Sequence, residues 1–163
     1  MPRTPPAAPA LQLTIVEPQL HPGVPGRATL RRWVTMALQA GAAGNAPPAG
    51  ATAQIALVFC DARAARRLNR EFRGRDYATN VLTFSYQVRP EPMADIVLCM
   101  PVVRREARTQ RKPVRDHLAH LVFHGVLHAL GHDHLQAAQT ATMQAIERAL
   151  LGRLRIPDPY ASG

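Results

Sequence analysis

Hydrophobic and polar residues follow two periods along this chain, one typical of strands and the other of helices. Residues 11–15 alternate between apolar and polar side chains, which predicts a half-buried strand. Near-continuous apolar runs at residues 53–60 and 95–100 predict buried strands, and residues 80–86 are rich in β-forming side chains. Together these segments predict a small mixed sheet of about four strands.

Apolar residues at helical spacing predict an amphipathic helix over residues 29–40. Asp61 is suited to cap a second helix over residues 62–72, and Gly74 is suited to end it. Three more helices are predicted at residues 101–109, 113–130 and 135–154. Strands interspersed with about five helices indicate an α/β (α+β layered) fold.

The length and composition fit one domain with its own core. The chain has 163 residues, of which 47% are hydrophobic, enough for a core without disulfides. We expect a single domain over residues 11–160 after a disordered, Pro- and Ala-rich tail at residues 1–10. Cys60 and Cys99 lie in apolar runs, so we expect buried thiols rather than a disulfide. The tail lacks the apolar core of a signal peptide and no run is long enough to cross a membrane, so a soluble, cytoplasmic protein is expected.

The charge of the chain favours a polyanionic partner. The formal net charge is +9, and of the 20 basic residues only Lys112 is not an arginine. A positive excess is typical of proteins that bind RNA or DNA, although a composition rich in Ala, Arg and Pro can also reflect mutational bias. Arginine binds phosphate through two parallel hydrogen bonds, which lysine cannot do.

The segment from His124 to His134 carries the candidate chemistry. His124 and His128 are four residues apart on a predicted helix, so both rings project from one face about one turn apart. Gly131 allows the chain to leave the helix with a positive φ and to return His134 toward the pair. Three neutral nitrogen ligands leave a fourth position for water, as in catalytic zinc sites. The sequence therefore predicts one Zn²⁺ on His124, His128 and His134, a ligand set that nickel or cobalt would also accept.

Other histidines compete for this assignment. His117, His120, His124 and His128 all fall within one arc of the predicted helix, so spacing alone does not exclude His120 with His124 as the metal pair. His128 is preferred because it lies closest to the returning turn. His117 and His120 are then expected to support the ligands by hydrogen bonds or to line the floor of a cleft. His132 is expected to be a surface residue of the turn.

The histidine pattern differs from that of zinc proteases at one position. In the protease motif His-Glu-x-x-His the glutamate is the general base, and that position is Gly125 here. Gly125 instead lets another element, or the substrate backbone, approach the helix closely. Asp133 is the nearest carboxylate, and it is a candidate either for a base or for a group that orients a ligand histidine. A hydrolase or protease of another substrate, and a non-catalytic ribosome-assembly factor with a structural zinc, remain alternatives.

Residues 124–134 match His-Gly-x-Leu-His-x-x-Gly-x-Asp-His, the signature of the YbeY family of bacterial rRNA-maturation endonucleases, at every defined position. Residues 68–84, 95–99 and 156–160 resemble further blocks of that family, so the resemblance covers roughly residues 53–160. The chain departs from the usual pattern at Ala94, at His132 and in the uncharged segment that follows the motif, and none of these changes removes a ligand.

The resemblance implies a single α/β domain with one zinc on three histidines. It also implies single-strand-specific RNA cleavage in small-subunit (16S) rRNA 3′-end maturation and ribosome quality control, with rRNA, the ribosome and its assembly proteins as partners. The essential arginine of the family maps onto Arg73. An arginine that follows a helix can hold a scissile phosphate, whereas a solvated helix end is the alternative from the residues alone. Arg73, His128 and Asp133 are therefore the catalytic candidates.

Overall fold

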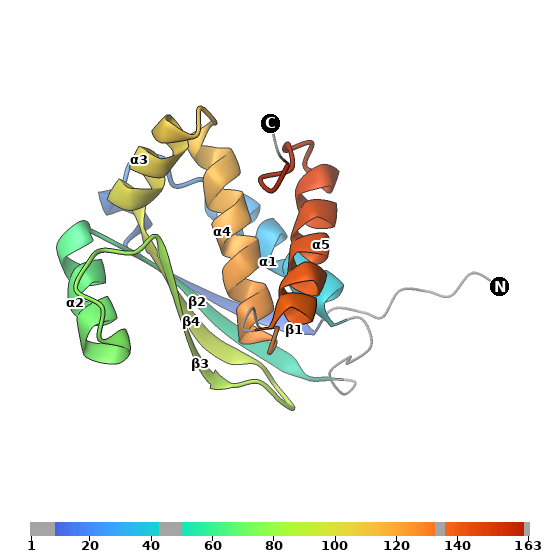
Figure 1. Ribbon diagram of the computed structural model, residues 1–163. Helices are drawn as coiled ribbons and strands as arrows, with labels where there is room; N and C mark the ends of the chain where they lie inside the picture. Colours follow the sequence, from blue (N-terminus) through green and yellow to red (C-terminus); the bar gives the residue numbers. More distant parts are fainter. Residues whose placement is uncertain (1–8, 43–49, 133–135, 162–163) are drawn as a thin grey trace.

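A mixed sheet forms the base of the structure, a computed structural model that describes residues 9–42, 50–132 and 136–161 (Figure 1). Within these ranges the sheet has four strands in the order β1-β2-β4-β3. The strands are β1 (Ala10–Val16), β2 (Thr52–Cys60), β3 (Val81–Gln87) and β4 (Met93–Cys99). The first three in this order are parallel to one another, and β3 is antiparallel to β4. The four predicted strands are thus confirmed as one sheet.

Most side chains of the two central strands are apolar, because both faces of the sheet are covered at their carboxyl ends. Ile96 and Leu98 of β4 belong to the main core, whereas Val97 and Cys99 point to a smaller core on the other face. Cys99 lies opposite Cys60 of β2 in the parallel register, and both side chains are buried free thiols. The prediction of thiols rather than a disulfide is therefore confirmed.

Five α-helices in the described ranges surround the sheet (Figure 1). They are α1 (Arg27–Gly41), α2 (Ala62–Arg73), α3 (Met100–Thr109), α4 (Val114–Ala129) and α5 (Ala137–Arg153). A short 3₁₀ helix, Pro18–Leu20, lies between β1 and α1. Helix α4 lies centrally between α1, α3 and α5 against the main core, and Ala65 of α2 packs into the smaller core. Within the described ranges, no helix combines the length and apolarity that crossing a membrane requires.

The helix ends follow the predicted capping residues. The Asp61 carboxylate accepts a hydrogen bond from the N–H of Ala64 at 2.8 Å, which caps α2. Gly74 ends the same helix with a φ of 68°, and Gly131 follows α4 with a φ of 93°. At the N-terminus, Ala10, the last residue of the predicted tail, already pairs with Thr52 in the sheet. Residues 1–8 of the predicted tail lie outside the described residues.

Candidate metal centre

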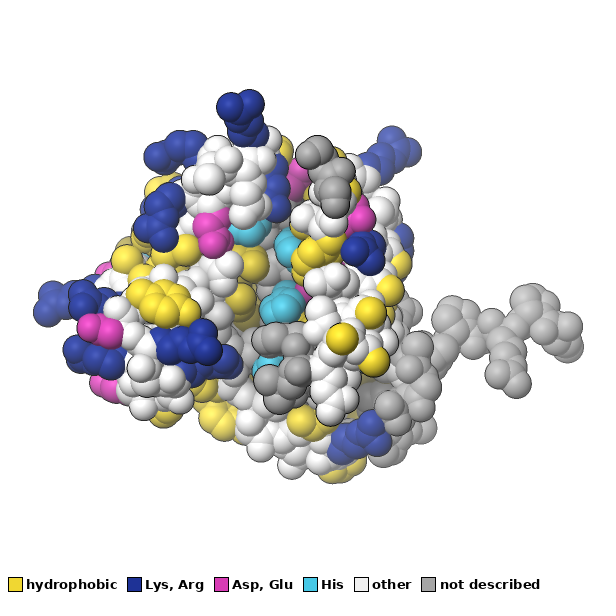
Figure 2. All heavy atoms as spheres, in the orientation of Figure 1, with side chains coloured by type: hydrophobic (Ala, Val, Ile, Leu, Met, Phe, Trp, Pro, Cys, Tyr) yellow, Lys and Arg dark blue, Asp and Glu magenta, His cyan; other side chains and the backbone are white. Residues whose placement is uncertain are grey.

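Helix α4 brings His124, one of the predicted ligands, to a hollow beside α5. His124 lines this hollow of about 220 Å³ together with Met143, Glu147 and Tyr160. Figure 2 shows histidine side chains in the hollow that runs down the middle of this face. His128 lies one turn further along α4 and is half-buried. His134 and Asp133 lie outside the described residues, so their predicted roles stay predictions.

A buried carboxylate on α5 holds the ring of His124. Glu147 has 0% of its surface exposed, and its Oε1 accepts a hydrogen bond from His124 Nδ1 at 2.6 Å. Its Oε2 accepts a second hydrogen bond from the Tyr160 hydroxyl at 2.5 Å. Burial alone would raise the pKa of Glu147, but its contacts with His120, His124 and Tyr160 lower that pKa to about 2. Glu147 is therefore an anion that fixes the orientation of its neighbours.

His120 belongs to the same network. Its Nε2 lies 3.0 Å from the Tyr160 hydroxyl and 3.6 Å from Glu147 Oε2. Since the hydroxyl proton goes to Glu147, His120 Nε2 donates to the tyrosine oxygen. His120 Nε2 is therefore engaged by Tyr160. This is the nitrogen that His120 would need if it formed the metal pair with His124.

The arrangement of His124 fits a metal ligand. A histidine whose Nδ1–H is held by a carboxylate carries its lone pair on Nε2, and this is the usual way in which ligating histidines are oriented. The described residues supply His124 and His128, two of the three predicted nitrogen donors. Within these ranges no three His, Cys, Asp or Glu side chains come close enough to hold an ion, and the third predicted donor lies beyond them. The donors that are described are those that a zinc-type ion prefers.

His117 lies at the other end of the helix and makes a separate contact. Its ring is only 4% exposed, and its Nε2 lies 2.9 Å from Glu106 Oε1 on α3. The same oxygen accepts a hydrogen bond from Asn80 at 2.9 Å, just before β3. Burial lowers the pKa of His117, although the contact with Glu106 opposes this effect. This pair joins α3, α4 and the start of β3 and does not reach the hollow beside α5.

The fold requires glycine at the two motif positions for different reasons. A Cβ on Gly125 would lie 2.7 Å from Ile96 Cγ2, so the close approach expected at this position is that of β4. Gly131 has the predicted positive φ. His132 was predicted as a surface residue, yet its ring is partly buried and Nε2 donates to the carbonyl of Gly41 at 3.1 Å. The turn after α4 is therefore tied to the end of α1.

Arg73 is the last residue of α2, and its side chain is exposed. Within the described part of the chain, no hydrogen bond joins it to a histidine of α4. Basic side chains gather over α2 on one flank of the hollow, as Figure 2 shows. One of them, Arg66, is paired with Asp76 at 2.8 Å. Arg73 thus lies on a basic flank of the site, and its catalytic role stays a prediction.

Glu147 and Tyr160 were missed as site residues from the sequence. Glu147 lies four residues after Met143 and three before Leu150, on the apolar stripe of the last predicted helix. A carboxylate in such a stripe needs a buried partner, and this need was the sequence signal that could have identified Glu147. Tyr160 stands out in the sequence only as part of a family-like ending. Neither residue could be linked to His124 without the packing of α5 on α4.

Comparison with known proteins identifies related chains over most of the sequence. The sequence profile of the family described as Endoribonuclease YbeY matches residues 24–155. A protein of Bordetella pertussis called Endoribonuclease YbeY is 56% identical over 133 residues, which is 80% of this chain and 84% of that protein. One of the same name from Alkalilimnicola ehrlichii is 48% identical over 160 residues, covering 94% and 93% of the two chains. The solution structure of TM1509 from Thermotoga maritima shares the fold, with a TM-score of 0.55 and 21% identity over 92% of this chain and 99% of that one.

Proposed function

Because the chain belongs to the Endoribonuclease YbeY family, we propose that it is a metal-dependent endoribonuclease of single-stranded RNA. Its role is the 3′-end maturation of small-subunit rRNA and ribosome quality control in the cytoplasm, with the ribosome and its assembly proteins as partners. The observation that carries the proposal is the His124–Glu147 pair beside a hollow in a strongly basic protein. A buried carboxylate that orients a half-exposed imidazole is typical of a metal centre.

The metal would be held by His124, His128 and His134. When bound, a zinc-type ion supplies a Lewis acid that lowers the pKa of water and stabilises negative charge on a phosphate. Glu147 keeps His124 in the ligating tautomer, and Tyr160 holds Glu147 in place. Asp133 is the candidate for moving a proton or for orienting a ligand.

The basic flank provides the contacts to RNA. Arg73 is the candidate for the scissile phosphate, because a guanidinium stabilises charge as it develops in the transition state. Phe72 and Tyr77 lie beside it with 64% and 51% of their surfaces exposed, so their rings are accessible to unpaired bases. Exposed aromatic rings among arginines favour a single strand over a duplex, whose bases are stacked on one another.

A metalloprotease mechanism is disfavoured by packing as well as by sequence. The position of the protease glutamate is Gly125, where even a methyl group would collide with Ile96. A longer acidic side chain has no room there, and it would point into the sheet rather than into the hollow.

The test is cleavage of a small-subunit rRNA 3′ fragment by the wild type, His128→Ala and Arg73→Ala proteins. We expect the wild type alone to cut, and a chelator to stop it. Arg63→Ala removes the same charge from the other end of α2, so we expect it to lower turnover far less than Arg73→Ala does. Equal cutting by all four proteins would mean a contaminating nuclease and would favour the assembly-factor alternative.

A further inference from the structure

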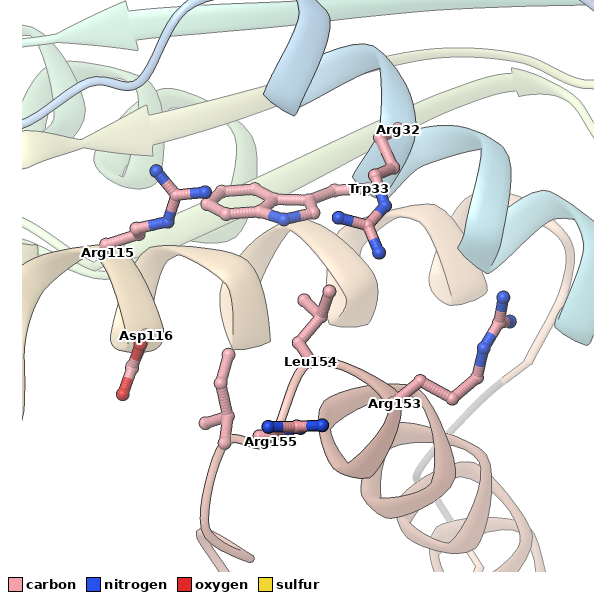
Figure 3. Close-up of a pocket in the computed structure, with 8 residues that line it drawn as sticks. Arg32, Trp33, Arg115, Asp116, Arg153, Leu154 and Arg155 are labelled. Carbon is pink, nitrogen blue, oxygen red and sulfur yellow. The ribbon is translucent and has the colours of Figure 1, made fainter.

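Four arginines surround a second hollow, away from the histidines (Figure 3). This arginine pocket has a volume of about 250 Å³ and is lined by Arg32 of α1, Arg115 of α4, and Arg153 and Arg155 at the end of α5. Trp33, which is 2% exposed, forms part of its wall. Three segments that are distant in sequence therefore place their guanidinium groups around one space.

The positive charge of this pocket exceeds the negative charge of the residues that line it. Asp116 is the single carboxylate among the residues lining the pocket. The arginine ion pairs found in the described ranges are Arg66 with Asp76 and Arg148 with Asp158, and neither involves the pocket. Like charges around one hollow repel each other, and an anion bound among them would relieve that repulsion.

Two of the arginines are held in place by their surroundings. The guanidinium carbon of Arg115 lies 5.7 Å from the centre of the Trp33 ring, a cation–π contact that restricts the side chain. Arg155 has a left-handed backbone with a φ of 59°, in a turn fixed by the hydrogen bond from Ile156 N–H to the Leu151 carbonyl at 2.9 Å. Such a conformation is uncommon for a residue other than glycine.

The helix dipole favours an arginine at position 153 but not at position 115. Arg153 lies in the last turn of α5, where a cation is favoured by the helix dipole. Arg115 lies in the first turn of α4, where the dipole disfavours a cation and favours an anion. An anion bound beside Arg115 would interact favourably with both the guanidinium and the helix end.

We propose that the arginine pocket binds the backbone phosphates of RNA that extends beyond the catalytic hollow. The identity of the anion as RNA rests on the proposed function. His124 follows Arg115 by nine residues, which is roughly 14 Å along α4 and half a turn around it. The two positions therefore face opposite sides of α4, and RNA that reaches both must pass around the helix, which a longer RNA can do. The pocket then selects for RNA length and holds the substrate outside the cleavage point.

The test compares a 5-nucleotide with a 25-nucleotide single-stranded RNA. Affinities are measured by fluorescence anisotropy in the full chain carrying His128→Ala, so that the RNA stays intact. Changing Arg32, Arg115, Arg153 and Arg155 to Gln is expected to weaken binding of the long RNA about tenfold and to change binding of the short RNA less than twofold. The salt dependence for the long RNA should also decrease, by about 0.7 in log–log slope for each phosphate that the variant no longer neutralises.

A matched variant controls for net charge. Changing Arg63, Arg67, Arg70 and Arg75 to Gln removes an equal charge from the flank of the catalytic hollow. This variant should bind both RNAs more weakly than the parent protein does. An equal decrease in affinity for both RNAs in the pocket variant would mean a general charge effect and would overturn the proposal. Unchanged binding of both RNAs, or weakened binding only of an acidic peptide such as polyglutamate, would also overturn it.

Two further measurements keep the result interpretable. Because the four side chains are exposed, their variants should keep the thermal unfolding midpoint, and the Arg153→Gln, Arg155→Gln pair leaves Trp33 untouched if packing is disturbed. Cleavage is measured separately in chains that retain His128. If the pocket variant loses affinity only for the long RNA, but the chain with His128 does not cut RNA, the proposed function is wrong and the RNA-binding role of the pocket is retained.

Discussion

Two histidines of α4 pair with glutamates of the neighbouring helices α3 and α5, and the two pairs differ in which partner is buried. In the pair of His117 with Glu106 the histidine side chain is 5% exposed and the carboxylate 32%. In the pair of His124 with Glu147 the histidine side chain is 29% exposed and the carboxylate 1%. The first pair joins three elements, whereas the second presents an imidazole to a hollow. Which partner is buried therefore distinguishes the packing contact from the pair whose histidine lines a hollow.

The largest expected effect comes from changing the buried carboxylate. Glu147→Gln should weaken zinc binding by about 10–100-fold, because it removes the acceptor that fixes the His124 tautomer. Zinc affinity is measured by competition with a chromophoric chelator. Glu106→Gln is the matched control and should leave zinc affinity within about twofold. Equal effects of the two changes would mean that the pairs do not differ as described.

The next effect concerns the approach of β4 to the His124 end of the helix. Gly125→Ala should destabilise the fold by about 1–3 kcal/mol, since the new methyl group would lie 2.7 Å from Ile96 Cγ2. Unfolding in urea gives the free energy. Gly152→Ala in α5 has no atom within 4 Å of the added Cβ and should be neutral or slightly stabilising. A destabilisation as large at Gly152 would contradict this account.

Tyr160→Phe should have a smaller effect, limited to the Glu147 pair. It removes a hydroxyl that donates to Glu147 and accepts from His120, so we expect a decrease of about 1 kcal/mol in unfolding free energy. Zinc affinity should fall only severalfold, because Glu147 still accepts from His124. An unchanged unfolding free energy would show that another group replaces the hydroxyl.

The smallest effect is a pH dependence of the His117 pair. Burial holds the pKa of His117 below its ordinary 6.5, so this residue stays neutral in the fold while the unfolded chain takes up a proton. Its contribution to stability is therefore complete above about pH 6.5 and is lost as the pH falls below that value. His117→Asn should flatten the decline in unfolding free energy between pH 7 and 5, measured by urea titration at each pH. An unchanged decline would assign it to other groups.

Local features of the fold were predictable because local physics decides them. Asp61, Gly74 and Gly131 fixed helix ends through capping and positive φ, and the apolar runs of β2 and β4 reflected burial on both faces. The order of the strands and the reversal of β3 depend on pairing between distant segments, which spacing does not encode.

The site divides in the same way. The spacing of His124 and His128 placed both on one helix, but it did not choose between His120 and His128 as the second donor. That choice is favoured by Tyr160, which lies 40 residues from His120 and engages its Nε2. The bond from His132 to Gly41 spans 91 residues, so this contact was not predictable from the turn alone. Both contacts arise from packing between segments that are distant in sequence.

The segment after α5 is joined to the site by a small number of side-chain contacts. Residues 154–161 contain no helix or strand, and they place Tyr160 on Glu147. Arg148 secures this segment by pairing with Asp158 at 3.0 Å and by lying over the Tyr160 ring. A few such contacts open far more often than a whole fold unravels. Local release of this segment would expose Glu147 to water without unfolding the rest of the domain.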